Sequence, residues 1–395
     1  MSRPALAALS LLAMTGAARA QTADLSDTER YTLRAELGLE YDTNAHRAEL
    51  VAYGDNPPLV ASPLERVVLA GTLSDAVAEG QLLTLGGTAA GKIFDAPGAR
   101  DEDVAIAQSS LAWAKTLSPR ATLTLSGAYY EAFQRAAANS VDASERRDFR
   151  SLAPTAQVGF VPRDRLDLSF SAGYRVFVFK PDRDDDFDAP ALAAELHWVP
   201  QTDGDADWEA SAGVAYERRA FGGPAFTVDA ADCTVVRKLP PGLACSDADS
   251  RRDDFLMSHL DVQRVGRVLL GAGYAFNYNR SNSYGESVMR HIATARFAAP
   301  LPGELTLAAR AEVLFAFYAQ PQLIGAIAAG NSFSSIESID DENRSSVRVD
   351  LSREIEQGVR LVARYTFYAN EIANTSPVSY RRQTFLLSVT GALEK

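Results

Sequence analysis

The fold of this chain is decided by the segment Tyr31-Thr32-Leu33-Arg34-Ala35-Glu36-Leu37-Gly38-Leu39-Glu40-Tyr41-Asp42. Apolar residues alternate one for one with polar residues or glycine along its whole length. Successive side chains of a β-strand point to opposite sides, whereas a helix repeats about every 3.6 residues. The segment therefore predicts a strand with one apolar face and one polar face.

The same alternation returns along the rest of the chain, for example in Leu123–Ser126, Leu166–Ser171 and Val347–Ser352. Between the predicted strands, short and long connections alternate. The short ones, rich in Pro, Gly and Asp, are 74–80, 118–120, 161–164, 200–205, 264–267, 300–303 and 356–358. The long ones are 45–62, 95–103, 135–147, 180–188, 220–253, 280–287, 319–344 and 370–379. Seven turns and eight loops join sixteen strands and leave both chain ends on the turn side.

Aromatic residues near the strand ends indicate a membrane environment. They are Tyr129, Tyr130, Phe177, Phe179, Tyr216, Phe276, Tyr278, Phe315, Phe317, Tyr318, Phe367 and Tyr368 before long loops, and Phe160, Trp198 and Phe297 before turns. Two such belts are typical of a transmembrane barrel, whereas a soluble sheet protein more often buries its aromatics in mid-strand. Because a strand edge in lipid would leave backbone groups unpaired, we expect the last strand, Thr384–Leu393, to close on the first.

These observations predict an all-β fold: a transmembrane antiparallel β-barrel of about 16 strands in the bacterial outer membrane, with short periplasmic turns and long extracellular loops. Residues 1–20 are typical of a signal peptide, with Arg3, an apolar run and the ending Ala18-Arg19-Ala20. That run of about 13 residues is too short for a membrane-spanning helix, which needs roughly 20. We expect a short periplasmic segment over 21–30 and the barrel over 31–395.

Charge and cysteine content add two expectations. The net charge of −12 argues against nucleic acid as a partner and is compatible with lipopolysaccharide and outer-membrane lipid as surroundings. The two cysteines, Cys233 and Cys245, share one loop of an exported chain, so we expect a disulfide between them. Two unpaired thiols are the alternative.

The polar faces of the strands would line the interior of the barrel, which at sixteen strands is wide enough for an aqueous channel. The predicted lining residues of the two charges fall in different parts of the chain. The basic ones are Arg34, Arg290, Arg296, Arg310, Arg348, Arg360 and Arg364, and the acidic ones are Asp167, Glu195, Glu209, Glu217 and Asp261. One hypothesis is a transverse electric field that orients polar solutes. The other is mutual neutralisation in lumenal networks, with Arg310 beside Glu312 and Arg348 beside Asp350.

Two loops have alternative interpretations. The apolar stretch 323–329 would either fold inward as a constriction or pack on the barrel rim. The acidic stretch 182–188 would either hold calcium or stay solvated, and it lacks the glycine and terminal glutamate of the common calcium loop.

Catalysis has little support in the sequence. None of the four histidines, His46, His197, His259 and His291, stands in a nucleophile, paired-metal or phosphate-loop motif. His259 with Asp261 would be the first suspected pair. We therefore expect no enzyme activity, no cofactor and no metal.

The segment Leu37-Gly38-Leu39-Glu40-Tyr41-Asp42-Thr43-Asn44 resembles the opening strand of outer-membrane β-barrel porins, some of them associated with exopolysaccharide production. The resemblance implies a pore or channel that passes polar solutes or polysaccharide. As an outer-membrane barrel, the chain is expected to have the β-barrel assembly machinery as a partner. Because only about ten residues separate the expected signal peptide from the first strand, polysaccharide export would need a separate periplasmic export partner. The alternatives are a surface-binding or structural barrel with a blocked lumen and an outer-membrane hydrolase.

Overall fold

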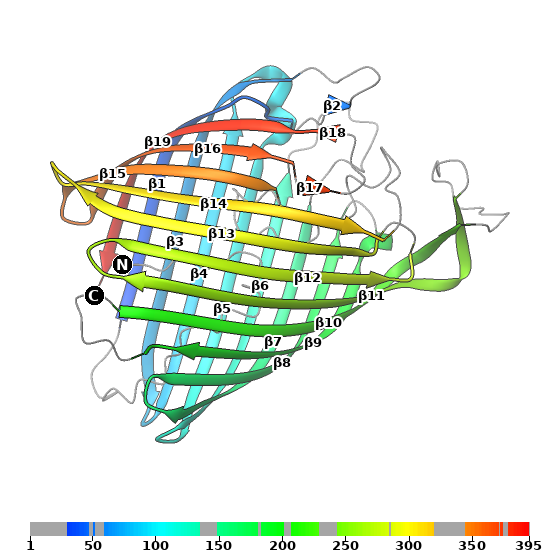
Figure 1. Cartoon of the computed structure of the whole chain (residues 1–395), viewed down its shortest axis with the longest axis horizontal. Helices are drawn as coiled ribbons and strands as arrows, with labels where there is room; N and C mark the ends of the chain where they lie inside the picture. Colours follow the sequence, from blue (N-terminus) through cyan, green and yellow to red (C-terminus); the bar gives the residue numbers. More distant parts are fainter. Residues whose placement is uncertain are drawn as a thin grey trace.

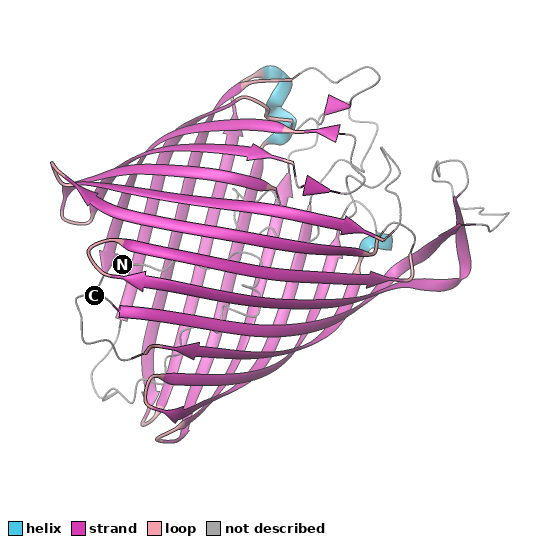
Figure 2. Ribbon diagram, in the orientation of Figure 1, coloured by secondary structure: helices cyan, strands magenta, loops and turns pink. Residues whose placement is uncertain are grey.

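The structure is a computed structural model in which sixteen long strands form one closed sheet (Figures 1 and 2). It describes residues 30–46, 50–51, 59–134, 148–180, 183–200, 207–228, 243–283, 286–319, 344–370, 372–373 and 378–394. The expected signal peptide, the periplasmic segment up to residue 29 and the apolar stretch 323–329 lie outside the described residues.

The long strands follow one another in chain order around the barrel, each antiparallel to the next. They are β1 (Arg30–Asp42), β3 (Ser62–Ala78), β4 (Gln81–Phe94), β5 (Val104–Ser118), β6 (Ala121–Gln134), β7 (Phe149–Arg163), β8 (Leu166–Phe179), β9 (Phe187–Trp198), β10 (Asp207–Val228), β11 (Leu243–Val265), β12 (Leu269–Ser281), β13 (Val288–Leu301), β14 (Leu305–Tyr318), β15 (Ser345–Glu356), β16 (Val359–Ala369) and β19 (Arg381–Glu394). The short elements are β2 (Leu50–Val51), β17 (Ile372–Ala373), β18 (Val378–Ser379) and the 3₁₀ turns η1 (Pro97–Glu102) and η3 (Arg183–Asp185). No helix among these residues is long and apolar enough to cross a membrane.

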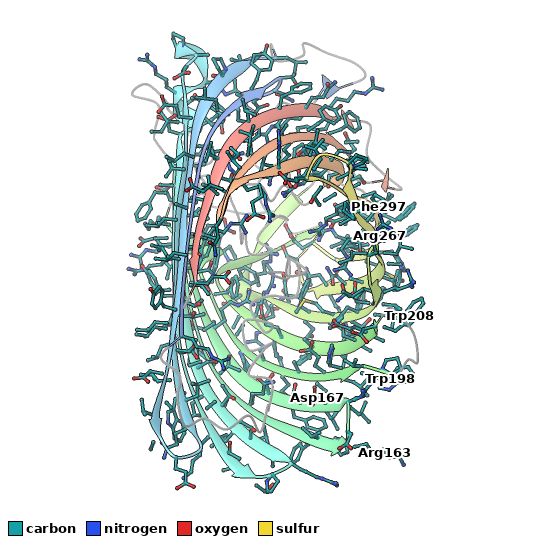
Figure 3. All side chains as sticks on the ribbon, turned by 90° about the vertical axis from the view of Figure 1, so that its left-hand side faces the viewer. Arg163, Asp167, Trp198, Trp208, Arg267 and Phe297 are labelled. Carbon is teal, nitrogen blue, oxygen red and sulfur yellow. The ribbon has the colours of Figure 1, made fainter. Side chains whose placement is uncertain are left out.

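Closure occurs between the last strand and the first, as expected. β1 pairs with β19 from Thr32 opposite Glu394 to Asp42 opposite Thr384, and on its other side β1 pairs with β3. Seen from the turn end, the barrel is not round, because its first strands, blue and cyan, form a flat side (Figure 3). Both ends of the described chain lie at the turn end (Figure 1).

The two faces of each strand differ as the alternation predicts. In β1 the side chains of Leu37 and Leu39 are 62% and 68% exposed, whereas Glu36 and Glu40 are only 7% and 5% exposed. Large apolar side chains lie on the outer surface of all sixteen long strands, and Trp198 and Trp208 project outward while Asp167 faces the lumen (Figure 3). A closed barrel with an apolar outer band and a polar interior is the architecture of the bacterial outer membrane, and the chain is an outer-membrane β-barrel.

Two expected connections are wrong in extent. The turn predicted over 74–80 is only Glu79-Gly80, because β3 continues to Ala78, and Gly80 adopts the positive φ of 65° that a tight turn requires. The loop predicted over 220–253 is a hairpin for most of its length, because β10 and β11 continue past the barrel (Figure 1). Backbone pairing of this hairpin tolerates the polar residues that suggested a loop.

The expected disulfide is not tested by this hairpin. Cys233 and the side chain of Cys245 lie outside the described residues, so the Cys233–Cys245 bond stays a prediction.

Five aromatic residues assigned to the membrane belts are instead buried inside the barrel. They are Tyr130, Phe177, Phe179, Tyr318 and Tyr368. The physical reason is the period of two: Tyr129 and Tyr130 are neighbours, so only one can face lipid, and Tyr129 is the exposed one. The outward positions of Tyr216, Tyr278, Phe317, Phe160 and Trp198 are confirmed.

Buried ion pairs hold the strands on either side of the closure. The guanidinium of Arg382 on β19 donates to both carboxylate oxygens of Asp42 on β1, and the two side chains are 3% and 0% exposed. Arg66 Nε donates to Glu36 Oε1 at 2.7 Å, and Lys92 Nζ donates to Glu40 Oε1 at 3.1 Å. These contacts connect β19, β1, β3 and β4 inside the barrel.

We predict that Arg382→Met lowers the free energy of unfolding by about 3–5 kcal/mol, because it leaves the Asp42 carboxylate buried without its cation. The double variant Asp42→Asn/Arg382→Met should lose much less. The measurement is urea unfolding in lipid vesicles followed by tryptophan fluorescence. Arg381→Met, at the exposed neighbouring position, is the matched control, and an equal loss in that variant would contradict the prediction.

Candidate functional site

Strand register places all twelve predicted lining residues on the lumenal face. Arg296, Arg310 and Arg348 lie directly opposite one another on β13, β14 and β15. The remaining basic residues, Arg34, Arg290, Arg360 and Arg364, share the lumenal register of their strands. So do the acidic residues Asp167, Glu195, Glu209, Glu217 and Asp261.

The lumenal face is buried toward the loop end and accessible toward the turn end. On β14 the exposure of Tyr318, Ala316 and Leu314 is 6%, 0% and 3%, whereas the side chains of Glu312 and Arg310 are 22% and 33% exposed. On β1, Asp42 is fully buried and Arg34 is exposed. Solvent therefore reaches the wall from the periplasmic end. We call the turn-side half of the lumen the periplasmic vestibule and define it by the lumenal residues Arg296, Arg310, Arg348, Arg364, Asp167, Glu195, Glu209 and Asp261, of which Asp261 is itself buried.

The arginine row on β13–β15 is stabilised by carboxylates beside it. Neighbouring strands lie only about 4.8 Å apart, so three guanidiniums in register would repel one another without counter-ions. Arg310 Nη2 donates to Glu312 Oε2 at 2.8 Å, and Arg348 Nη2 donates to Asp350 Oδ2 at 2.7 Å. Both pairs were predicted as neutralising partners and are confirmed.

Two further contacts extend this network across strands. Arg364 Nε donates to Asp350 Oδ1 at 2.9 Å, and Arg296 on β13 donates to Asp261 on β11. The second pair reaches over β12, where Gly271 and Gly273 have no side chain; a Cβ at Gly273 would lie 2.7 Å from Asp261 Oδ2. The four arginines and their three carboxylates leave a positive balance on this side of the vestibule.

The acidic side of the vestibule lies on β8–β11. Glu209 Oε2 accepts a hydrogen bond from Gln263 Nε2 at 2.7 Å. Within the described part of the chain, Asp167 and Glu195 have no hydrogen bond or ion pair. This side therefore keeps a negative balance that adjoins the positive one at the Asp261–Arg296 pair.

The hypothesis of two opposed and unneutralised walls does not fit these contacts. Glu217, counted with the acidic wall, is 1% exposed and lies between Arg175, at 3.1 Å, and Arg219, at 2.6 Å. Asp261 is likewise paired with Arg296. Neutralising networks therefore dominate, and uncompensated charge is confined to patches within the vestibule.

The sequence reasoning missed an aromatic stack and several buried charges in the loop-side half of the lumen. The rings of Tyr130, Phe149, Phe177, Phe187 and Phe221 follow one another on β6–β10 with centroid separations of 5.3, 5.1, 4.8 and 5.2 Å. The missed charged residues are Glu36, Glu40, Asp42, Arg66, Lys92, Arg175, Arg219, Arg251, Asp253, Glu286 and Arg382. The odd or even position of a residue along its strand could have revealed these residues. Phe177, for example, is an even number of positions from Asp167 on β8 and therefore lies on the same lumenal face.

A buried cluster of carboxylates surrounds Arg251 at the extracellular end. Arg251 Nη2 donates to Asp253 Oδ2 at 2.7 Å and to Glu286 Oε2 at 2.9 Å. Burial raises the pKa of Asp185 on η3 to about 6, an effect that Arg251 opposes and Glu286 reinforces. Burial also raises the pKa of Glu286. Across the described residues, no three acidic, histidine or cysteine side chains are grouped to hold a metal, and calcium binding by 182–188 stays open.

The suspected catalytic pair is not assembled. The Asp261 carboxylate pairs with Arg296, and among the residues that the structure describes His259 Nδ1 has no hydrogen-bond partner. The ring of His259 lies over Gly213, where a Cβ would be 2.9 Å from Nδ1. The expectation that the chain is not an enzyme stays a prediction.

Comparisons with known proteins give structural likenesses only. No protein-family model matches the sequence, and no curated protein matches it. The structure is similar to OpdK, an outer membrane protein of Pseudomonas aeruginosa, with 10% identity, a TM-score of 0.48 and coverage of 93% of this chain and 99% of that one. It is similar to a BenF-like porin of Pseudomonas fluorescens Pf-5, with 8% identity, a TM-score of 0.49 and the same coverages. For OmpT of Vibrio cholerae the identity is 10%, the TM-score 0.43 and the coverages again 93% and 99%.

We predict that the extracellular end loosens as the pH rises from about 4 to above 6. A folded-state pKa of about 6 for Asp185, above its usual 3.8, means that the folded state favours the protonated acid. The resulting stabilisation, at most about 3 kcal/mol, is present below pH 4 and is lost as Asp185 ionises. Hydrogen exchange over residues 183–188, corrected for the intrinsic rate, measures it.

Asp185→Asn should remove most of this pH dependence. Asp254→Asn is the control, because Asp254 lies at the same end but on the outer face, hydrogen-bonded to Tyr216. Identical pH profiles in the wild-type protein and Asp185→Asn would contradict the prediction.

Proposed function

We propose that the barrel is an outer-membrane channel for polar solutes and that its periplasmic vestibule favours anionic ones. The arginine row of Arg296, Arg310 and Arg348 is the observation that carries this proposal. A guanidinium has five N–H donors in a fixed plane and binds carboxylates, sulfates and phosphates at two points. Arg310 and Arg348 are about one third exposed on the lumenal side, so they keep donor surface toward a solute.

Small residues around the row leave room for a solute. Ala308 lies on the lumenal face of β14, directly opposite Asp350, and Gly271 and Gly273 face the lumen on β12. The wall on β4–β6 carries hydroxyls, including Thr88, Ser110 and Ser126 on its lumenal face, and the charge of Lys92 on β4 is paired with Glu40. A charged side that binds anions and a neutral side that offers hydroxyls suit acidic, hydroxyl-rich molecules.

Acidic polysaccharide is the larger member of this solute class. The resemblance of β1 to the porins associated with exopolysaccharide production supports its inclusion in the proposal. A polysaccharide route would add a periplasmic export partner at the turn end, where the vestibule opens.

A surface-binding barrel with a blocked lumen is the second candidate, and one observation favours it. The lumenal side chains of the loop-side half are buried, including Glu217, Asp253 and Asp42 at about 1% exposure or less. On this second reading the loop-side half closes the lumen, and transport would require that half to open.

Planar-bilayer recording of the refolded protein tests the proposal. We expect ion conductance with preference for chloride over potassium, read from the reversal potential in a KCl gradient, and block by a sulfated dextran added to the periplasmic side. Arg310→Gln/Arg348→Gln should lower the chloride preference several-fold, because it removes two of the three guanidiniums in register.

Arg353→Gln is the matched control, because Arg353 is on β15 with Arg348 but is exposed near the turn, 3.8 Å from Glu304. No conductance in the wild-type protein at any voltage would favour the blocked barrel. Unchanged ion preference in the double variant would remove the arginine row from the proposal.

A further inference from the structure

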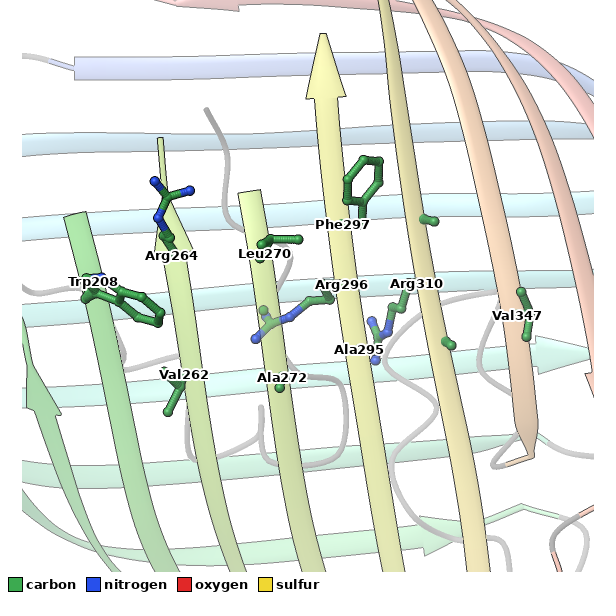
Figure 4. Close-up of a pocket in the computed structure, with 13 residues that line it drawn as sticks. Trp208, Val262, Arg264, Leu270, Ala272, Ala295, Arg296, Phe297, Arg310 and Val347 are labelled. Carbon is green, nitrogen blue, oxygen red and sulfur yellow. The ribbon is translucent and has the colours of Figure 1, made fainter. Parts of the chain in front are cut away.

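The outer surface has an apolar hollow of about 520 Å³ over β10–β15 (Figure 4). Its floor consists of alanines that are directly opposite one another: Ala272 on β12, Ala295 on β13 and Ala311 on β14. Because each contributes only a methyl group, the floor is lower than the large side chains around it. Leu270 and Phe297, opposite each other, form part of the rim.

The hollow belongs to the lipid-facing surface and not to the vestibule. Trp208 and Leu270, which line it, are 44% and 48% exposed on the outer face. The guanidiniums of Arg296 and Arg310 lie behind the strands in Figure 4, on the lumenal side. A molecule in the hollow would therefore be within the bilayer.

A positively charged side chain, that of Arg264, lies at the periplasmic edge of the hollow. Arg264 is directly opposite Trp208 on β10 and Leu270 on β12, so its side chain is on the outer face with them. It is the second residue from the end of β11, at the level where Trp208 begins the periplasmic aromatic belt. Among the described residues, Arg264 has no hydrogen bond or ion pair.

We propose that this hollow is a binding site for one glycerophospholipid of the periplasmic leaflet. An acyl chain fills the alanine floor between Leu270 and Phe297, and the phosphate accepts hydrogen bonds from the Arg264 guanidinium. The site matches both parts of a phospholipid. Its apolar floor runs toward the membrane centre, where the acyl chain lies, and the Arg264 guanidinium lies at the depth of the phosphate headgroup. An unpaired guanidinium near lipid is itself costly, and the phosphate supplies its counter-ion.

Charge favours a phospholipid over a second copy of the chain as the occupant. A twofold dimer across the hollow would place the same surface against itself, including two Arg264 side chains and no outward carboxylate from the hollow. A phospholipid brings one negative charge and an apolar tail together.

Native mass spectrometry tests the site, with purified full-length protein in detergent micelles doped with dioleoyl phosphatidylglycerol. We expect one lipid retained per wild-type chain. Arg264→Gln should weaken retention about tenfold, the amount expected for one charge-assisted contact. Ala295→Trp, which fills the floor, should abolish retention. Dioleoylglycerol, which lacks the phosphate, should bind the wild-type chain no better than phosphatidylglycerol binds Arg264→Gln.

Two controls match the variants. Arg280→Gln removes an outward arginine at the opposite end of β12, and Ala172→Trp adds bulk at an exposed outward alanine on β8; both should retain the lipid. A heat-dependent shift in gel mobility verifies that each barrel has closed. Equal retention in all variants would overturn the proposal, and so would a wild-type dimer that Ala295→Trp dissociates without any change in bound lipid.

Discussion

The backbone of this protein must satisfy its own hydrogen bonds, because the hydrocarbon around it offers none. The sixteen long strands meet that constraint by closing β19 on β1 over eleven residue pairs. Because the closed barrel is a single sheet, each side chain of a strand lies either on the lipid-facing side or on the lumenal side. Leu37 and Leu39 face lipid, and Glu36 and Glu40 face the lumen, on a wall one strand thick.

The barrel could be predicted from the sequence because this two-way division is a local property. Alternation in Tyr31–Asp42 and the change between short turns and long loops sufficed for strand number, orientation and closure. Residue type misleads where it conflicts with the odd or even position of the residue along its strand. Phe177 and Phe179 resemble belt aromatics by composition, but they fall on the same strand face as Asp167 and point into the lumen, and the polar residues of 220–253 belong for the most part to a paired hairpin.

The charged lining could be predicted only in part, for a related reason. The alternation of side chains along each strand places all twelve residues on the lumenal face. It also predicts pairs between residues two positions apart, such as Arg310 with Glu312. Pairs between strands depend on register, which a single sequence does not reveal. Arg296 reaches Asp261 across two glycines of β12, and Arg175 reaches Glu217 from two strands away. These pairs decide where charge remains uncompensated.

A wall one strand thick also couples the vestibule to the hollow outside it. Arg296 faces the lumen, while its chain neighbours Ala295 and Phe297 line the lipid-facing hollow. A guanidinium this near to hydrocarbon is less well solvated than one on a soluble protein, which raises the cost of leaving it unpaired. Asp261 reduces that cost from the lumenal side. On the outer side, the small residues of β12–β14 that line the hollow alternate with lumenal residues of the same strands, so one strand segment carries both the arginines of the proposed solute site and the alanines of the proposed lipid site.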